Sequence, residues 1–247
     1  GTVSINNVTV KNSSVKSESS YVGAVAGRIN ANAKLDGISV EAFSAEGANY
    51  IAGVAGLAQG EISMSNIVVS EAKLNGVSEI SGVTAGSASI KNVTVKNSEI
   101  STVAISSAYT AGGVSAVFSG TVENATVENT KISAGVAAGI VGKTSADGKL
   151  TISGANVIGC EISSAEANTV AAGILGVHNV KGSVAISGAA VDAGTVIGGA
   201  AVSEKHAGFV VNLGGATASD VRLLLKEVAK KVLDATGISL EPEVRIW

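Results

Sequence analysis

The chain has 247 residues, of which 46% are hydrophobic but only 3% aromatic, with 31 glycines and a single proline. This profile fits a thin core of small aliphatic side chains and fits poorly with a ligand pocket lined by aromatic rings. The net charge is −3 and no basic run occurs, which argues against a nucleic-acid partner because phosphate neutralisation dominates such binding. No apolar stretch reaches the roughly eighteen residues of a membrane-spanning helix.

A pattern of four apolar positions recurs seven times along the chain. Counted from the first apolar residue of each copy, the others stand three, five and ten residues later, and the one at five is always Val. The copies begin at Ile5, Leu35, Met64, Ile90, Val122, Ile152 and Ile186. Alternation with a period of two indicates strands, and a repeat of roughly thirty residues is typical of a stacked solenoid.

The residue before the second apolar position breaks the alternation. It is Asn or Gly in every copy: Asn7, Gly37, Asn66, Asn92, Asn124, Gly154 and Gly188. Both residue types tolerate left-handed backbone angles, so the sequence predicts a bend there, with the apolar neighbours on either side pointing inward. Each copy then continues into a segment of Gly and small residues, which lets neighbouring backbones come close.

These patterns predict a mainly β fold. Residues 1–197 are expected to form a right-handed parallel β-helix of about seven coils, since crossovers between parallel strands are generally right-handed. Residues 198–247 form a separate short α/β tail. Stacking in register would place Lys11 beside Glu41 and Lys96 beside Glu128, and each such pair contributes about 0.2–1 kcal/mol.

The tail contains the one segment with a helical period. Residues 218–235 carry an apolar stripe, with Thr217 as a candidate N-cap, Asp220 three residues later and Gly237 as a candidate C-terminal stop. The stripe consists of Val221, Leu224, Leu225, Val228, Val232 and Leu233.

Residues 1–197 resemble a known repeat family. The segment 21–27 and its cognates, interleaved with Asn-Val-Thr-Val-Lys-Asn-Ser segments, are similar to the GLUG-motif repeats of bacterial surface and adhesin-like proteins. The resemblance implies an extracellular or cell-surface solenoid whose ligand, a glycan or a surface protein, the sequence does not specify.

The tail resembles a different family. Segments 198–212, 216–221 and 240–245 are similar to the C-terminal part of UDP-N-acetylenolpyruvoylglucosamine reductase, the flavoenzyme that makes UDP-N-acetylmuramate for peptidoglycan. The resemblance implies that Glu243 helps to protonate the enolpyruvyl group after a hydride arrives from reduced flavin. Nothing in the chain matches the family's flavin-binding region or its general-acid serine. Because catalysis needs its groups placed together, the sequence predicts no cofactor and no enzyme activity, with Glu243 as a catalytic residue only if the tail is functional.

Three functions stay open at this point. The leading hypothesis is a non-catalytic structural or adhesive module whose tail covers the last coil. The alternative is a fragment or fusion of the reductase's substrate domain, which would be cytoplasmic. A second alternative is a carbohydrate-active β-helix enzyme, which would need paired carboxylates on one coil face. His178 and His206 lack metal-ligand spacing, so no metal is expected, and Cys160 is expected to be a buried thiol.

Overall fold

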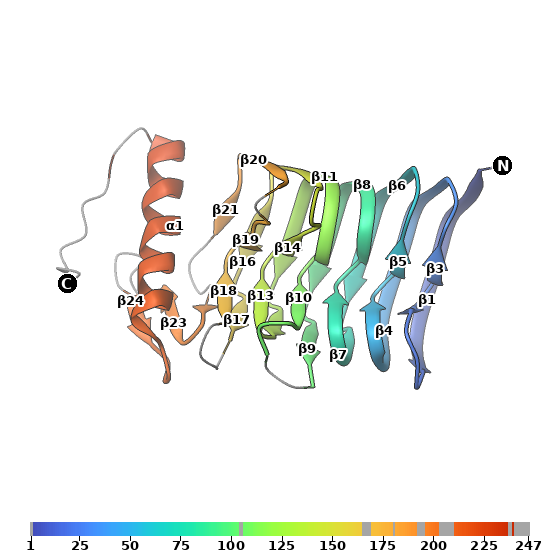
Figure 1. Ribbon diagram of the computed structural model, residues 1–247, viewed down its shortest axis with the longest axis horizontal. Helices are drawn as coiled ribbons and strands as arrows, with labels where there is room; N and C mark the ends of the chain where they lie inside the picture. The colour runs from blue at the N-terminus through green and yellow to red at the C-terminus, as the bar shows by residue number, and fades with distance from the viewer. Residues whose placement is uncertain are drawn as a thin grey trace.

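The computed structural model describes residues 2–103, 106–164, 169–179, 181–191, 196–202, 210–236 and Ser239. Strands stack along one axis in a solenoid of about six turns, and a helix lies across the end nearest the C-terminus (Figure 1). The predicted mainly β solenoid with one C-terminal helix is therefore confirmed, and its handedness stays a prediction. No helix in the part of the chain that is described has the length and apolar character needed to cross a membrane.

The strands are short pieces of successive coils. Strands β1 to β12 are Val3–Lys16, Val22–Gly23, Ala26–Ile29, Ala33–Ala52, Ala55–Ala58, Ile62–Ser70, Lys73–Ser81, Thr84–Lys96, Glu99–Thr102, Thr110–Gly112, Ser115–Glu128 and Lys131–Ser133. Strands β13 to β24 are Val136–Ala138, Val141–Thr144, Lys149–Ser153, Asn156–Ile158, Glu161–Ser163, Val170–Ala172, Leu175–Val177, Ser183–Ser187, Ala190–Val191, Val196–Ile197, Ala200–Val202 and Val210–Asn212. The helix α1 is Ala218–Thr236.

Parallel pairing from coil to coil keeps the apolar columns in register. β1 pairs with β4, β4 with β6, β6 with β8 and β8 with β11, so that Leu35, Met64 and Ile90 follow one another inside the stack. These three side chains are at most 1% exposed. The last coil departs from the prediction, because Ile197 and not Val196 pairs with Ile162. The final copy thus holds one residue more than the spacing of the earlier copies indicated.

Left-handed backbone angles turn the chain at the predicted bends. All seven predicted bend residues have φ between +52° and +66°. A second set of bends, two residues after the Val column, was not predicted. It comprises Asn12, Ala42, Glu71, Asn97, Asn129 and Gly159. Two bends close together let one long strand such as β1 wrap around a corner of the coil without losing its pairing to β4.

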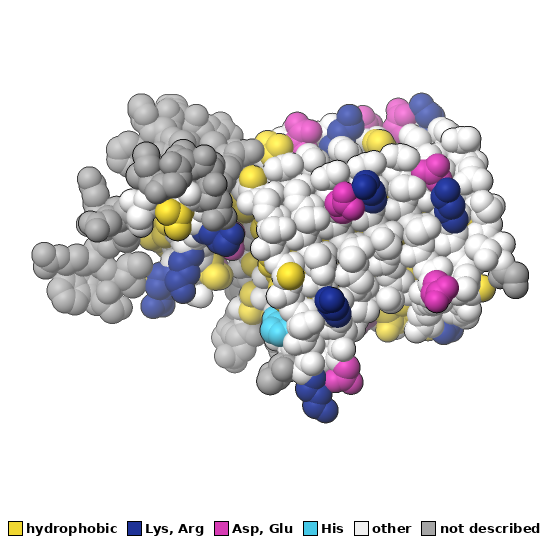
Figure 2. Space-filling model, turned by 90° about the horizontal axis from the view of Figure 1, so that it is seen from above, with side chains coloured by type: hydrophobic (Ala, Val, Ile, Leu, Met, Phe, Trp, Pro, Cys, Tyr) yellow, Lys and Arg dark blue, Asp and Glu magenta, His cyan; other side chains and the backbone are white. Residues whose placement is uncertain are grey.

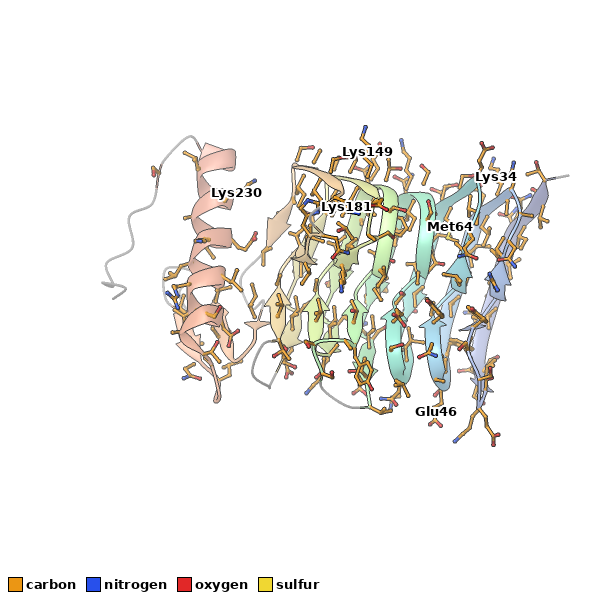
Figure 3. The ribbon with its side chains drawn as sticks, viewed as in Figure 1. Lys34, Glu46, Met64, Lys149, Lys181 and Lys230 are labelled. Carbon is orange, nitrogen blue, oxygen red and sulfur yellow. The ribbon has the colours of Figure 1, made fainter. Side chains whose placement is uncertain are left out.

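Charged side chains lie on the outside of the coils. Met64 points into the stack, whereas Lys34 and Lys149 lie on one rim and Glu46 on the other (Figure 3). The predicted pair of Lys11 and Glu41 is confirmed, with 2.6 Å between Nζ and Oε2. Lys96 and Glu128 are neighbours across strands, but they form no ion pair among the residues described. Seen from above, the coil surface carries scattered charges of both signs among uncharged side chains, and some opposite charges lie side by side (Figure 2).

The parallel stack ends in a small antiparallel unit. β22 pairs with β23 and β23 with β24, both antiparallel, and α1 lies over β21, β22 and β23. Leu224 of the helix is fully buried and belongs to the same cluster of buried side chains as Ile162 and Ile197. The predicted helix over 218–235 is confirmed with its end at Thr236. Within the predicted apolar stripe, Leu224 is buried, whereas the side chain of Leu233 is 46% exposed.

Candidate functional site

The turn between β22 and β23 is built on a close approach to the helix. The Gly198 N–H donates a hydrogen bond to the Ile162 carbonyl at 2.6 Å, which fixes the turn to the last complete coil. Gly198 has φ of +63°, and a Cβ there would lie 2.1 Å from Cγ of Asp220. A larger residue would therefore both strain the backbone and push the helix away.

The start of α1 is held by reciprocal hydrogen bonds between Thr217 and Asp220. The Thr217 N–H donates to Oδ2 of Asp220 at 2.8 Å, and the Asp220 N–H donates to Oγ1 of Thr217 at 3.2 Å. This is a capping box with Asp at its third helical position, and it satisfies backbone donors that the first turn leaves free. The predicted N-cap is confirmed.

The loop before the helix is organised by Asn212, at the end of β24. Its Oδ1 accepts hydrogen bonds from the Gly214 N–H at 2.8 Å and the Ala216 N–H at 3.3 Å. The Leu213 N–H donates to the Gly199 carbonyl at 2.9 Å. Asn212, Gly199 and Asp220 thus join the turn, the loop and the helix into one small polar unit at the end of the coils.

Replacing Asp220 by Ala tests this unit. We expect Asp220→Ala to lower the free energy of unfolding by about 1–2 kcal/mol, because the loss of a cap costs that much and Asp220 is 7% exposed. Urea denaturation followed by circular dichroism measures the change. Ser219→Ala, at an exposed position of the same turn, is the matched control and should change the free energy by less than about 0.5 kcal/mol. Equal effects of the two substitutions would contradict the role given to Asp220.

A cavity of about 80 Å³ lies between α1 and the last coil, where the two are otherwise packed together. Glu227 and Lys230 line it on the helix side, and Ile186, Ala189 and Val191 line it on the coil side. Lys230 projects from α1 (Figure 3). Burial raises the pKa of the Glu227 carboxyl, and the nearby Lys230 partly opposes the shift. The helix therefore rests on the coil end through apolar contacts with one carboxylate among them.

Two hollows among the described residues, the cavity beneath α1 and a depression on the coil surface, do not fit a flavin. Ligand pockets usually enclose about 300–1,000 Å³, so the cavity beneath α1 is too small for a planar three-ring group. The larger hollow, of about 450 Å³, is an open depression on the coil surface lined by small residues such as Gly60, Ser87 and Gly120. It offers no aromatic ring to stack on an isoalloxazine.

The other predicted residues form no common site. Glu243 and His206 lie outside the described residues. Nδ1 of His178 lies 3.4 Å from Oγ1 of Thr144. No group of three His, Cys, Asp or Glu in the described ranges could hold a metal. Cys160 is buried as expected, and burial raises the pKa of its thiol to about 11.

Among the described residues, four glutamates form separate ion pairs with lysines of neighbouring coils. Glu46, Glu123 and Glu161 each face a lysine of a neighbouring coil, at 2.8 to 3.2 Å. Carboxylates spread in this way give no support to the carbohydrate-active enzyme considered from the sequence, because that chemistry needs two carboxyl groups on either side of one bond.

Comparison with known proteins places the C-terminal unit in a family context. The family model of the UDP-N-acetylenolpyruvoylglucosamine reductase C-terminal domain matches residues 183–247. The C-terminal segment matches this reductase domain. The reductase of Syntrophotalea carbinolica is 60% identical over 53 residues, which are 22% of this chain and 18% of the relative. The reductases of Thermotoga petrophila and Thermotoga maritima are each 59% identical over 51 residues, 21% of this chain and 18% of the relative.

The chain spans less than a fifth of the length of these relatives. No solved structure matches it. The match overturns the leading hypothesis from the sequence, which was a non-catalytic adhesive module. The prediction that the chain is not an enzyme is wrong as well, because the relatives are named as reductases. The adhesin-like and cell-surface description fails with them, and the GLUG resemblance gains no support from the comparisons.

Proposed function

We propose that the C-terminal segment works as the end of the substrate domain of a UDP-N-acetylenolpyruvoylglucosamine reductase. In this proposal the chain binds the UDP-sugar in the cytoplasm, and Glu243 supplies a proton to the enolpyruvyl group. The identity of 59% to 60% over 51 to 53 residues supports it most strongly. We place the boundary between the coils and the tail between residues 197 and 198, although the family match begins at residue 183, within the last coil.

The described residues of the segment suit a supporting role in such a site. The Gly198 turn, the Asn212 loop and the Thr217–Asp220 cap brace the start of α1, and the segment with Glu243 follows α1 directly in the sequence. A positioned carboxyl group typically contributes about a hundredfold to ten-thousandfold to a proton transfer. In the family a flavin delivers the hydride, but neither of the two hollows described above fits one. We therefore assign substrate binding and protonation to this chain, and not hydride delivery.

A calorimetric titration tests the proposal. UDP-N-acetylglucosamine enolpyruvate is titrated into the whole chain and into two variants, Glu243→Gln and Glu241→Gln. Saturable heat is expected for the unchanged chain and for Glu241→Gln, which removes a carboxylate two residues away. Glu243→Gln should bind about tenfold or more weakly, the size expected for a lost hydrogen bond to a charged group. No heat in the unchanged chain, or equal behaviour of the two variants, would refute the assignment.

A further inference from the structure

Two tyrosine side chains lie one above the other in successive coils. Val22 of β2 pairs with Ile51 of β4, so Tyr21 and Tyr50, which precede them, occupy the same position in the first and second coils. Their rings have centroids 5.2 Å apart and planes inclined by 13°. This is a parallel stack at a separation that aromatic pairs ordinarily adopt.

An unusual backbone conformation sets the direction of both rings. Tyr21 has φ of +72° and Tyr50 has φ of +56°, in the left-handed region that bulky residues rarely adopt. A glycine lies against each of them, because a Cβ on Gly27 would collide with the Tyr21 carbonyl oxygen and one on Gly56 with that of Tyr50. Since the two coils repeat the same local packing, their tyrosine side chains leave the backbone in the same direction.

Arg28 holds the Tyr21 ring in the stack. Its guanidinium carbon lies 5.0 Å from the ring centroid, within reach of a cation–π attraction. Its Nη2 donates a hydrogen bond to Oε1 of Gln59 at 2.7 Å, and Gln59 belongs to the second coil. The Tyr21 ring therefore loses both the stack and the cation contact if it turns away.

The chain offers an internal comparison for this pair. Tyr21 and Tyr50 are each half-buried, so a reagent in solution can reach them. Tyr109, the third tyrosine of the chain, is half-buried as well. It lies outside the column of the pair, which continues with Glu79 because Ile51 pairs with Ile80. Three phenols thus have the same chemistry and similar exposure, but the stack joins two of them.

We propose that Tyr21 and Tyr50 form an oxidative cross-linking site, at which a peroxidase-type one-electron oxidant joins the two coils by a dityrosine bond. Each phenol gives up one electron and its hydroxyl proton and becomes a phenoxyl radical, whose unpaired electron is shared with the ring carbons next to the C–O bond. Two such carbons, one from each ring, form a carbon–carbon bond. The hydrogen on each coupled carbon then moves to the oxygen of its ring, which restores both phenols. Hydrogen peroxide takes up the two electrons and two protons and leaves as two water molecules.

The stack favours coupling within this pair because the two radicals form side by side. Groups that are held next to each other react faster than groups that must first meet by diffusion. The bond closes the chain between residues 21 and 50 into a loop, which restricts the unfolded state and so stabilises the two coils.

The test is oxidation of the whole protein, at low concentration, by a haem peroxidase with hydrogen peroxide. Trypsin then cuts the chain so that Tyr21 lies in peptide 17–28 and Tyr50 in peptide 35–73. The expected product is these two peptides joined, with a mass two hydrogens below their sum in mass spectrometry. In a mixture of isotope-labelled and unlabelled protein, both halves of the product should come from the same kind of chain.

Tyr109, in peptide 97–131, supplies the matched control. Products that join this peptide to either of the others should be about tenfold or more scarcer than the expected product, because Tyr109 lacks the proximity of the stacked pair. Tyr21→Phe and Tyr50→Phe each keep a ring in the stack but remove the phenol, so each should abolish the product. Tyr109→Phe should leave its yield unchanged.

Three results would overturn the proposal. The first is the absence of the joined peptides after oxidation. The second is coupling to Tyr109 in equal yield, since the stack would then give no preference. The third is a product that combines labelled and unlabelled halves at random, since the bond would then form between two molecules and not between two coils of one chain.

Discussion

Gly113→Ala should lower the free energy of unfolding by about 3 kcal/mol, the upper part of the usual range for an overpacked core. A Cβ on Gly113 would lie 2.0 Å from the carbonyl oxygen of Gly139 in the next coil. Gly82 has the same relation to Gly113, at 1.8 Å. Because these are backbone atoms held by pairing on both sides, neither coil can move away without loss of its register. Urea denaturation measures the effect.

Gly173→Ala is the matched control for this prediction. Gly173 follows Gly139 in the same column, but the three atoms nearest to a Cβ there all belong to the side chain of Val191, the closest at 2.8 Å. A valine methyl can turn aside, so the substitution should cost less than about 1 kcal/mol, since side-chain adjustments are cheaper than backbone shifts. A loss as large as that of Gly113→Ala would show that the clash with backbone is not what makes the column sensitive.

Leu224→Ala should destabilise the chain by about 2–4 kcal/mol, the cost of emptying a fully buried leucine site. Leu224 is 0% exposed and joins α1 to the cluster that includes Val191, Ile197 and Val202. Its truncation weakens the cover over the last coil, so binding of an apolar dye should increase together with the loss of stability. Solenoids depend on such end caps for solubility.

Leu233→Ala provides the comparison on the same helix. Its side chain is 46% exposed, so the change should alter the free energy of unfolding by less than about 0.5 kcal/mol. If Leu224→Ala were equally mild, the helix would not be docked through its buried face, and the description of α1 as the cover of the coils would be wrong.

The coil architecture was predictable because its physical requirements recur in every copy. Asn and Gly at the first bend are the residues that accept left-handed angles, and all seven positions have them. The second bend was not predicted because two of its six positions, Ala42 and Glu71, are not the Asn or Gly that mark a left-handed turn. A third set of left-handed residues includes Tyr21 and Tyr50, whose rings stack with centroids 5.2 Å apart. Stacking between coils compensates there for a conformation that a bulky residue rarely adopts alone.

The function was predicted wrongly because the amino-acid composition of the whole chain reflects mainly the coils and not the C-terminal segment. The scarcity of aromatic residues is a property of the coils, which make up about four-fifths of the chain, and it says little about a segment of about fifty residues at the end. The cap of Thr217 and Asp220 could be read from local spacing, because hydrogen bonds between them need only those two residue types. The approach of Gly198 to Asp220 could not, since it depends on the antiparallel turn that follows the last coil. The role of Glu243 came from family resemblance alone.

Amide hydrogen exchange with and without UDP-N-acetylglucosamine enolpyruvate tests most directly whether the C-terminal segment holds the substrate site. Added at saturating concentration, the ligand should slow exchange in peptides from residues 198–247 and leave the coils of residues 2–164 unchanged. Protection in the coils, or no change anywhere, would contradict the account.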